Sequence, residues 1–197
     1  MKRIIELFAV TALTFSAGLS GNAQAQSVSQ PLSFVAGAGY GRGGDLVAVG
    51  VYTDGSITNV KAGNGLDIYL GAAYRLGQYF AVQADAGYQS STGSAVNGEL
   101  TFKRFPIETL GYFYVTDSWR LGGGARFDER VKLSGTGVAS SAQQDFDSAV
   151  GAIAEIEYLV SPHFGVKFRG VKEKFKPTGS TTSIKGDQAA ILATLYF

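Results

Sequence analysis

The sequence predicts an all-β protein, a closed eight-stranded antiparallel barrel that crosses a membrane as strands. Eight segments alternate between apolar and polar residues with a period of two, which is the side-chain period of a β-strand. Tight and long connections alternate along the chain, as in barrels of the bacterial outer membrane. After the N-terminal segment, no apolar stretch is long enough to cross a bilayer as a helix.

Residues 1–25 are expected to be a signal peptide, which is removed and takes no part in the fold. Lys2 and Arg3 form its charged start, and a short apolar run follows them. Ala23 and Ala25 form an A-x-A cleavage signal, so the mature chain should start directly after residue 25.

The rest of the chain is long enough for one domain, with a short leader over 26–31 and the barrel over 32–197. The chain has 17 basic and 16 acidic residues, and removing two bases and one acid with the signal peptide leaves 15 of each. This balance argues against nucleic acid as a partner. There is no Cys, so stability must come from a hydrogen-bonded framework without disulfides.

A tight-turn signal follows the first barrel strand. Leu46–Tyr52 and Ile57–Ala62 flank Asp54-Gly55, which is typical of a hairpin. Folding about this turn places Gly44 near Gly65. We therefore expect the first two strands to continue past the membrane as a projecting two-stranded ribbon.

The other elements follow in order, with a strand expected wherever the alternation holds. Tight turns on one side and long Ser/Thr/Gly-rich loops on the other predict that turns and both termini are periplasmic and loops extracellular. The alternating segments are residues 32–40, 66–76, 80–89, 104–115, 119–130, 147–158, 164–173 and 188–197. The tight turns are expected at 76–78, 116–118 and 161–163, and the loops near 90–95, 134–144 and 177–183.

Pro106 lies inside one of these strands, where its missing N–H cannot be hidden at an edge. Apolar residues occupy even positions up to Phe102 and odd positions from Phe105 onwards. This change of phase predicts a β-bulge within Lys103–Pro106.

Which set of side chains faces inward decides between two kinds of barrel. A secreted lipocalin-like barrel is apolar inside, whereas a membrane barrel is apolar outside. Most arginines share the polar set with acids, and Trp119 lies beside a tight turn with Tyr74 and Tyr158 at the same level, which resembles an interfacial aromatic girdle. These features favour the membrane barrel.

Hairpins centred on Asp117 and Pro162 place opposite charges face to face, in the pairs Glu108–Arg126, Glu155–Arg169 and Glu157–Lys167. Side chains fill the interior of a barrel this narrow, so we expect an ion-pair network that plugs the lumen. The predicted network has seven bases and seven acids, namely Arg75, Arg104, Arg120, Arg126, Arg130, Lys167 and Arg169 with Asp67, Asp85, Glu108, Asp128, Glu155, Glu157 and Glu173.

With its Ala23-Gln24-Ala25 signal, its eight alternating segments and its last residues Leu195, Tyr196 and Phe197, the mature chain resembles the small outer-membrane barrels of the OmpX and OmpA-barrel type. The resemblance implies a monomer in the outer membrane of a Gram-negative bacterium, in contact with outer-membrane lipid and lipopolysaccharide. It also implies that the barrel-assembly machinery reads the three terminal residues as its signal. Unlike full-length OmpA, the chain is not expected to carry a C-terminal peptidoglycan-binding domain.

Three further motifs bear on ligand binding or catalysis. Gly39–Gly44 matches G-x-G-x-x-G but has no helix after it, so no nucleotide site is expected. His163 lies in a predicted periplasmic turn, the wrong leaflet for lipid A chemistry, and no catalytic, metal or cofactor site is predicted. Lys172, Lys174 and Lys176 share one face near the outer rim, where they either bind lipopolysaccharide phosphates or are simply solvated.

Three functions remain open at this point. The first is a non-enzymatic surface barrel that contributes to envelope integrity, with loops that contact lipopolysaccharide, host surfaces or other cells. The second is a narrow conduit for small or hydrophobic solutes, and the third is a lipid A-modifying enzyme. A lumen filled by ion pairs leaves little room for a water column, which favours the first.

Overall fold

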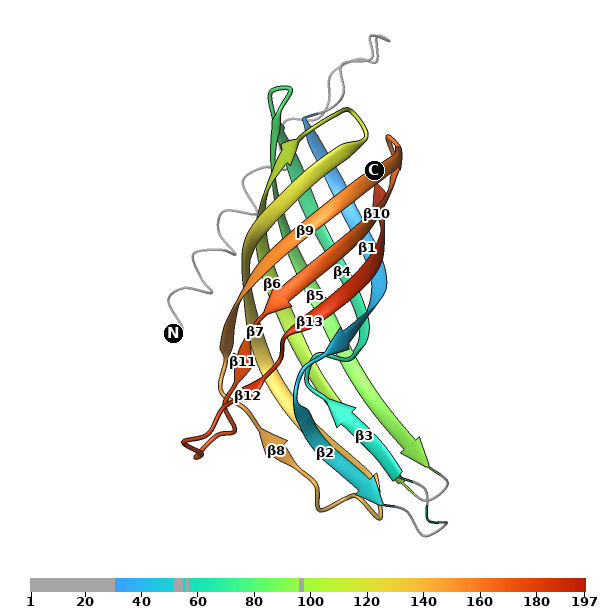
Figure 1. The fold of residues 1–197 in the computed structure, drawn as a ribbon, viewed down its shortest axis with the longest axis vertical. Helices are drawn as coiled ribbons and strands as arrows, with labels where there is room; N and C mark the ends of the chain where they lie inside the picture. The colour runs from blue at the N-terminus through green and yellow to red at the C-terminus, as the bar shows by residue number, and fades with distance from the viewer. Residues whose placement is uncertain (1–30, 52–54, 56, 96–97) are drawn as a thin grey trace, which may run out of the picture. The chain divides into compact units, whose positions relative to one another are not determined.

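In the computed structural model, eight long antiparallel strands form a closed barrel, so the predicted fold class is confirmed (Figure 1). The structure describes residues 31–197 except 52–54, 56 and 96–97, so the predicted signal peptide and its cleavage site lie outside the described residues. The long strands are β1 (Leu32–Gly43), β4 (Gly65–Leu76), β5 (Phe80–Ala95), β6 (Gly98–Tyr114), β7 (Trp119–Gly137), β9 (Ala149–Ser161), β10 (Phe164–Lys172) and β13 (Gln188–Tyr196).

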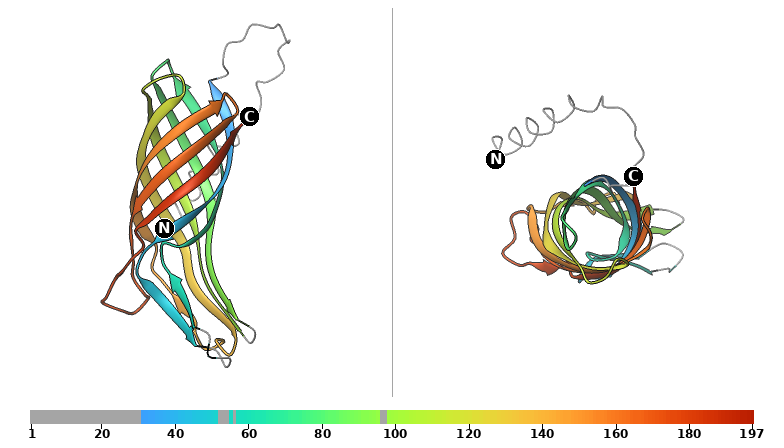
Figure 2. Two further views of the ribbon diagram at one scale, coloured as in Figure 1. Left: turned by 45° about the vertical axis from the view of Figure 1, so that its right-hand side comes forward. Right: turned by 90° about the horizontal axis from the view of Figure 1, so that it is seen from above.

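Each long strand pairs with the next long strand in the chain, and β13 pairs with β1 to close the ring. The right-hand view of Figure 2 looks along the barrel and shows this ring. In the part of the chain that the structure describes, no helix is long and apolar enough to cross a membrane.

Five short strands lie at one end of the barrel, at the bottom of Figure 1. They are β2 (Leu46–Val51), β3 (Ile57–Lys61), β8 (Gln144–Asp145), β11 (Lys174–Phe175) and β12 (Ile184–Lys185). The strands β2 and β3 pair with each other, β11 pairs with β12, and β8 adds to the edge of β7. We call these strands, together with the ends of β5, β6 and β7 beside them, the extension. The opposite end, which holds the tight turns and both ends of the barrel chain, is the turn end.

The two faces of the long strands differ as a membrane barrel requires. On β4, Leu66, Ile68 and Leu70 are exposed on the outside, whereas Asp67 and Tyr69 are buried inside. The alternation follows from the pleat of the strand, which sends successive side chains to opposite faces. The expected direction of the polar set is therefore confirmed for this strand.

Aromatic side chains lie on the outer face near the tight turns. Trp119 stands opposite Tyr158 in the β7–β9 pair, and their ring centroids are 4.8 Å apart. Both side chains are exposed, as predicted for residues of a girdle that faces lipid.

The predicted cross-strand partners are confirmed by the register of the sheet. Glu108 stands opposite Arg126 in the β6–β7 pair. The β9–β10 pair brings Arg169 opposite Glu155 and Lys167 opposite Glu157. These registers follow from the tight turns, which fix which residues meet in a hairpin.

The predicted irregularity is present beside Lys103, but the extra residue is on the neighbouring strand. The register of β6 against β7 shifts between Lys103 and Phe105, and this two-residue step faces the three-residue step from Lys132 to Glu129. The bulge therefore belongs to β7. Its Arg130 has a φ of 51°, in the left-handed region that a bulge residue can occupy.

Strand β6 keeps one phase throughout, so the predicted change of face in this strand is wrong. Phe102, Arg104, Pro106 and Glu108 all point inward and are buried. Phe102 and the neighbouring Leu100 are apolar because the interior of the extension is apolar, and not because they face lipid.

The ribbon of β2 and β3 is present beyond the eight-stranded ring, but its register differs by one residue from the predicted hairpin. Val51 stands opposite Ile57, and a side chain on Gly44 would collide with the backbone of Gly63, not of Gly65. Of the predicted turn, Asp54 lies outside the described residues. The ribbon packs on the ends of β5 and β6 and buries Val60, so it does not project freely.

Candidate functional site

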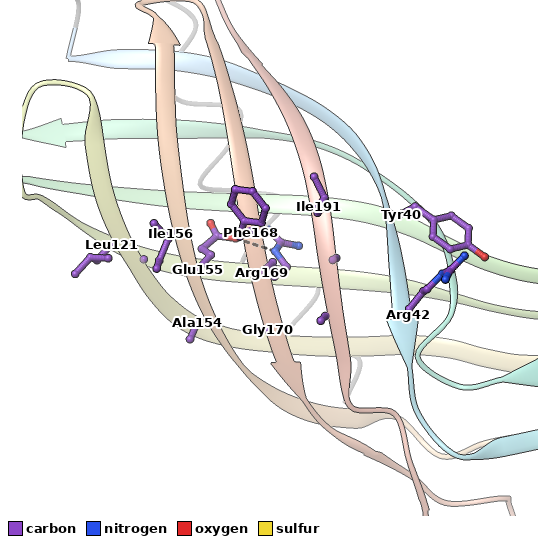
Figure 3. Close-up of a pocket in the computed structure, with 13 residues that line it drawn as sticks. Tyr40, Arg42, Leu121, Ala154, Glu155, Ile156, Phe168, Arg169, Gly170 and Ile191 are labelled. Atoms are coloured by element: carbon purple, nitrogen blue, oxygen red, sulfur yellow. Dashed lines mark hydrogen bonds and ion pairs between the residues drawn. The ribbon is translucent and has the colours of Figure 1, made fainter.

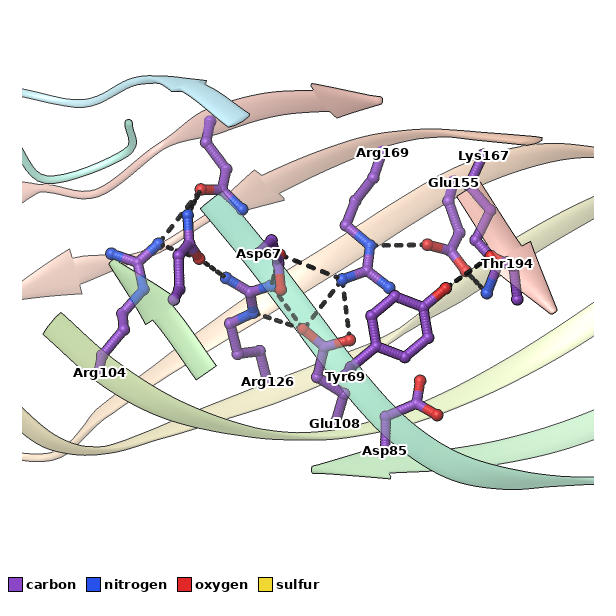
Figure 4. A network of polar contacts seen from close by, with 12 residues as sticks. Asp67, Tyr69, Asp85, Arg104, Glu108, Arg126, Glu155, Lys167, Arg169 and Thr194 are labelled. Carbon is purple, nitrogen blue, oxygen red and sulfur yellow. Dashed lines mark hydrogen bonds and ion pairs between the residues drawn. The ribbon is translucent and has the colours of Figure 1, made fainter. Parts of the chain in front are cut away.

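The inside of the barrel buries charged side chains, which we call the lumen network (Figure 4). Among the residues that the structure describes, it contains five bases and seven acids, and none of them is more than 4% exposed. The bases are Arg104, Arg120, Arg126, Lys167 and Arg169, and the acids are Asp67, Asp85, Glu108, Asp128, Glu155, Glu157 and Glu173.

Glu108 is at the centre of the network, between two arginines from different strands. Arg126 donates from Nε to Glu108 Oε1 over 2.7 Å, and Arg169 Nη1 lies 3.0 Å from Glu108 Oε2. Arg169 also donates from Nε to Glu155 over 2.8 Å, and Asp67 lies 3.4 Å from Arg126. Glu108, Arg126 and Arg169 therefore each have several opposite partners, which is the condition for burying charges in a protein interior.

Toward the turn end, tyrosines join the charges. Arg120 donates from Nε to Glu157 over 2.8 Å, and its guanidinium lies 3.9 Å from the centroid of the Tyr112 ring. The Tyr196 hydroxyl donates to the other oxygen of Glu157 over 2.6 Å, and Lys167 donates to the Tyr112 hydroxyl over 2.9 Å. The rings fill the lumen between the ion pairs and supply hydroxyl groups to them.

Toward the extension, Arg104 connects the network to the ribbon. Its Nη1 donates to the backbone carbonyl of Ala62 over 2.5 Å, and its Nη2 lies 2.9 Å from Glu173. Its Nε lies 3.4 Å from Asp128. Glu173 follows the end of β10, between two outward-facing lysines, and burial raises the pKa of this carboxyl to about 8, with Arg104 opposing the rise and Asp128 adding to it.

Two bases that sequence reasoning placed in the network are not part of it. Arg75 is only half-buried at the turn end, where it donates to the backbone carbonyls of Gly77 and Gln78. Arg130 points outward and is exposed, because the β7 bulge shifts the phase of that strand by one residue. Parity alone could not reveal either the open end of the lumen or the bulge.

Asp85 is buried as predicted, but its surroundings are unusual. Its Oδ2 accepts a hydrogen bond from Gln83 Nε2 over 2.8 Å. In the described part of the chain no Lys or Arg nitrogen lies within 4.0 Å of its carboxylate. The other predicted acids each lie within this distance of a base. Asp67 and Glu173 are buried in the network as predicted, and each lies within this distance of a base.

Uncharged polar side chains of the lumen were also missed. Arg104 and Arg126 both donate to Gln89 Oε1, and Gln89 in turn donates to Gln188 over 2.6 Å. Tyr69 and Thr194 share a hydroxyl–hydroxyl bond of 2.6 Å (Figure 4). In the sequence these residues alternate in phase with the charged residues, and this shared strand face was the signal that could have placed them in the lumen.

The remaining predicted site residues are away from the lumen. Lys172, Lys174 and Lys176 are exposed on the outer face beside the extension. His163 lies in its turn, with Nδ1 2.9 Å from the Tyr196 carbonyl oxygen. In the last strand, Leu195 is exposed and Tyr196 is buried, while Phe197 is exposed and donates from its backbone N to Phe34 O over 3.0 Å.

The residues Gly39–Gly44, which match G-x-G-x-x-G, lie in β1 and directly after it. The next element is the strand β2 and not a helix, so these residues do not have the context of a nucleotide-binding loop. Within the described residues, no three His, Cys, Asp or Glu side chains are grouped so that they could hold a metal ion.

A groove of about 970 Å³ lies on the outer surface of β1, β13, β10, β9 and β7 (Figure 3). Phe168, Ile191 and Tyr40 border it, and the small residues Ala154 and Gly170 form its floor. These side chains are on the outer apolar face, so the groove is relief on the lipid-facing surface, although Glu155 and Arg169 of the lumen network also line it.

The sequence profile of the family described as outer membrane protein beta-barrel domain matches residues 11–197. Ail, the attachment invasion locus protein of Yersinia pestis, is a similar solved structure with a TM-score of 0.55 and 14% identity, covering 84% of this chain and 96% of that chain. A second Ail structure, in complex with the heparin analogue sucrose octasulfate, has a TM-score of 0.51 and 16% identity over the same shares.

Neisserial surface protein A has a TM-score of 0.51 and 13% identity, covering 85% of this chain and 96% of that chain. At these identities the likeness shows a shared fold. No curated protein sequence matches the chain.

Proposed function

Because the chain belongs to the outer membrane protein beta-barrel family, we propose that it is a non-enzymatic barrel of the Gram-negative outer membrane that supports envelope integrity and surface interaction. The observation that carries this proposal is the lumen network, whose twelve charged side chains are at most 4% exposed. A barrel with such an interior adds a rigid element to the membrane without opening a path through it.

The plugged lumen is tested against the conduit by conductance in planar bilayers. The ion pairs and the tyrosines Tyr69, Tyr112 and Tyr196 fill the lumen on several levels. We expect no steady current from the purified protein under conditions in which an open porin conducts. A steady current would favour the conduit.

We place the turn end in the periplasm and the extension outside the cell. The extension has its own apolar core, which gives a rigid platform, and exposes Val49 and Ile57 at 48% and 66%. Limited proteolysis of intact cells should cut the extension. Cleavage that requires access to the periplasm would invert this orientation.

A deletion strain tests both parts of the role. Loss of the protein should make cells more sensitive to detergent and lower their binding to surfaces. The variant V49S/I57S should restore detergent resistance but not surface binding, because it changes exposed side chains of the ribbon and leaves the lumen intact. Full restoration of both would show that these exposed side chains of the ribbon do not mediate surface binding. An altered lipid A mass spectrum in the deletion strain would favour an enzyme.

Lys172, Lys174 and Lys176 are proposed to bind lipopolysaccharide phosphates as point charges, since all three are exposed on the outer face. Changing the three lysines to Gln should lower the amount of lipopolysaccharide that purifies with the barrel. Lys61→Gln, at an exposed lysine of the ribbon, is the matched control. Equal amounts in both variants would leave the lysines as a solvated strand end.

The barrel-assembly machinery is proposed to read Leu195, Tyr196 and Phe197. Deleting Phe197 should lower the amount of folded protein in the outer membrane without changing synthesis. Normal yield and normal heat-modifiable mobility of the truncated protein would contradict this role.

A further inference from the structure

The lumen network does not balance its charges. The described residues bury five bases against seven acids, so the fully ionised network has a charge of −2. Arg75 and Arg130 cannot compensate, since one is half-buried at the turn end and the other is exposed outside. A surplus of buried charge is strongly unfavourable, and a carboxyl in this situation takes up a proton.

The surplus can be located by following the ion pairs. Four bases and four acids form a balanced group in which each acid lies between 2.5 and 3.4 Å from a base of the group. The bases are Arg120, Arg126, Lys167 and Arg169, and the acids are Asp67, Glu108, Glu155 and Glu157. The surplus therefore consists of Asp85, which has no base beside it, and of Asp128 and Glu173, which share Arg104.

Asp85 on β5 directly faces another acid. Glu108 stands opposite it on β6, while Lys167 and Arg169 of β10 act on it only from beyond 4.0 Å. Asp85 Oδ1 and Gln83 Oε1 are both buried acceptors without a hydrogen bond. A proton on Asp85 supplies the missing donor, because the Gln83 amide can turn and accept it over the same 2.8 Å contact.

The second excess acid is in the pair Asp128 and Glu173. Their carboxyl groups lie within hydrogen-bonding reach of each other, and none of their four oxygens has a hydrogen bond to a described residue. Arg104 lies 2.9 Å from Glu173 and 3.4 Å from Asp128, and Arg126 lies 4.0 Å from Glu173. The remaining charged group beside the pair is Asp187, whose Oδ1 accepts from the backbone N of Glu173 over 3.1 Å.

We propose that the folded barrel takes up two protons that the unfolded chain releases, one on Asp85 and one on Glu173. Each proton then supplies one donor where buried acceptors have none, and the charge of the lumen network falls to zero. A metal cation is disfavoured at the Asp128–Glu173 site by the guanidinium of Arg104. This uptake depends on burial of the network and not on the role of the barrel at the surface.

An acid-to-amide comparison at about pH 5 tests the assignment, since an amide imitates a protonated carboxyl. Asp85→Asn and Glu173→Gln should leave the unfolding midpoint in detergent unchanged or raise it. Glu108→Gln is the matched control and should lower the midpoint clearly, because Arg126 and Arg169 both pair with Glu108. If Asp85→Asn or Glu173→Gln lowers the midpoint as much as Glu108→Gln, the proposal is wrong.

The pH dependence has a defined sign. The unfolded chain releases these protons above the ordinary carboxyl pKa of about 4, whereas the folded barrel keeps them to a higher pH, so the midpoint should fall as the pH rises from about 4 until the folded barrel also releases them. The double variant D85N/E173Q should lose most of this slope. An equal slope in wild type and double variant would overturn the assignment.

Infrared spectroscopy separates protons from metal ions. The wild type should show the carbonyl stretch of protonated carboxylic acids, and each single variant, Asp85→Asn or Glu173→Gln, should reduce that band. A spectrum without the band, together with a midpoint that follows Na⁺ or K⁺ concentration instead of pH, would show that cations neutralise the lumen and would overturn the proposal.

Discussion

The lumen and the interior of the extension are built by the same strands with opposite chemistry. In the lumen, β6 and β7 point Glu108 and Arg126 inward, and their outer side chains are apolar. In the extension the same two strands point Phe102 and Leu133 inward, and residues such as Glu99 face outward. The alternation of faces continues along both strands, with one phase shift at the β7 bulge, so the medium around the barrel decides which set of side chains is apolar.

The two interiors meet within one layer of side chains. The Arg104 guanidinium lies 4.9 Å from the centroid of the Phe175 ring, whose own centroid is 5.6 Å from that of Phe102. Arg104 also ties the lumen to the ribbon through the Ala62 carbonyl. The change from ion pairs to an apolar core is therefore bridged by an arginine that has both carboxylate and aromatic partners.

The largest effect is expected in the lumen, from Arg126→Ala. The substitution leaves Glu108 and Asp67 with an uncompensated buried charge, which should cost about 3–5 kcal/mol of the free energy of unfolding. Changing Glu108 and Arg126 together to uncharged residues of similar size should recover much of the loss. The unfolding midpoints of the two single variants and the double variant form a cycle, and additive losses would mean that the two side chains do not couple.

In the extension, Phe175→Ala should cost about 3 kcal/mol, because it leaves a cavity beside Phe102 in the apolar core. Unlike the substitution in the lumen, this substitution should destabilise the extension and not the whole barrel. Hydrogen exchange should speed up in β2, β3 and β6 near Phe102, while the eight-stranded ring keeps its protection. Equal loss of protection in the ring would show that the two regions unfold as one unit.

Sequence reasoning predicted the ring and its central pairs because tight turns and a strict period fix the register of hairpins. It failed where the surroundings of a strand change. The apolar Leu100 and Phe102 predicted a change of phase in β6, whereas they keep the inward phase and are apolar because the extension has an apolar core. Arg75 kept the right parity but reaches the open turn end, and Arg130 lost its parity at a bulge that composition does not reveal.

The partners of Asp67 and Glu173 show a second limit. Parity placed both acids in the lumen as predicted, but their partners depend on three-dimensional distance to bases on other strands, such as the 2.9 Å between Glu173 and Arg104. The register of a single hairpin predicts only the pairs that stand opposite each other on adjacent strands. Contacts across the lumen, such as Asp67 with Arg169 at 3.8 Å, require the closed ring.

Substitutions at the β7 bulge test the boundary between the lumen and the extension. Arg130 has a φ of 51°, a conformation that costs a residue with a side chain about 1 kcal/mol and glycine little. Arg130→Gly should therefore raise the unfolding midpoint slightly, by a gain of about 0.5–1 kcal/mol, and Arg130→Val should lower it. A lower midpoint for the glycine variant would mean that the exposed guanidinium stabilises the outer face.

The smallest effect is expected from an ion pair on the outside of the extension. Lys132 Nζ lies 3.5 Å from Asp145 Oδ1, with side chains that are 40% and 70% exposed, so the pair is solvated and screened by salt. Lys132→Ala should change the free energy of unfolding by less than about 0.5 kcal/mol, against several for Arg126→Ala, although each substitution removes one base from an ion pair. Raising the salt concentration should abolish the small effect and leave the large one nearly unchanged, as measured by the unfolding midpoints of both variants. A loss of about 2 kcal/mol at Lys132 would mean that the pair holds β8 against β7 as part of the packed extension. The ion pairs of the lumen and of the extension would then be similar in strength, and the two regions would differ only in the polarity of their interior side chains.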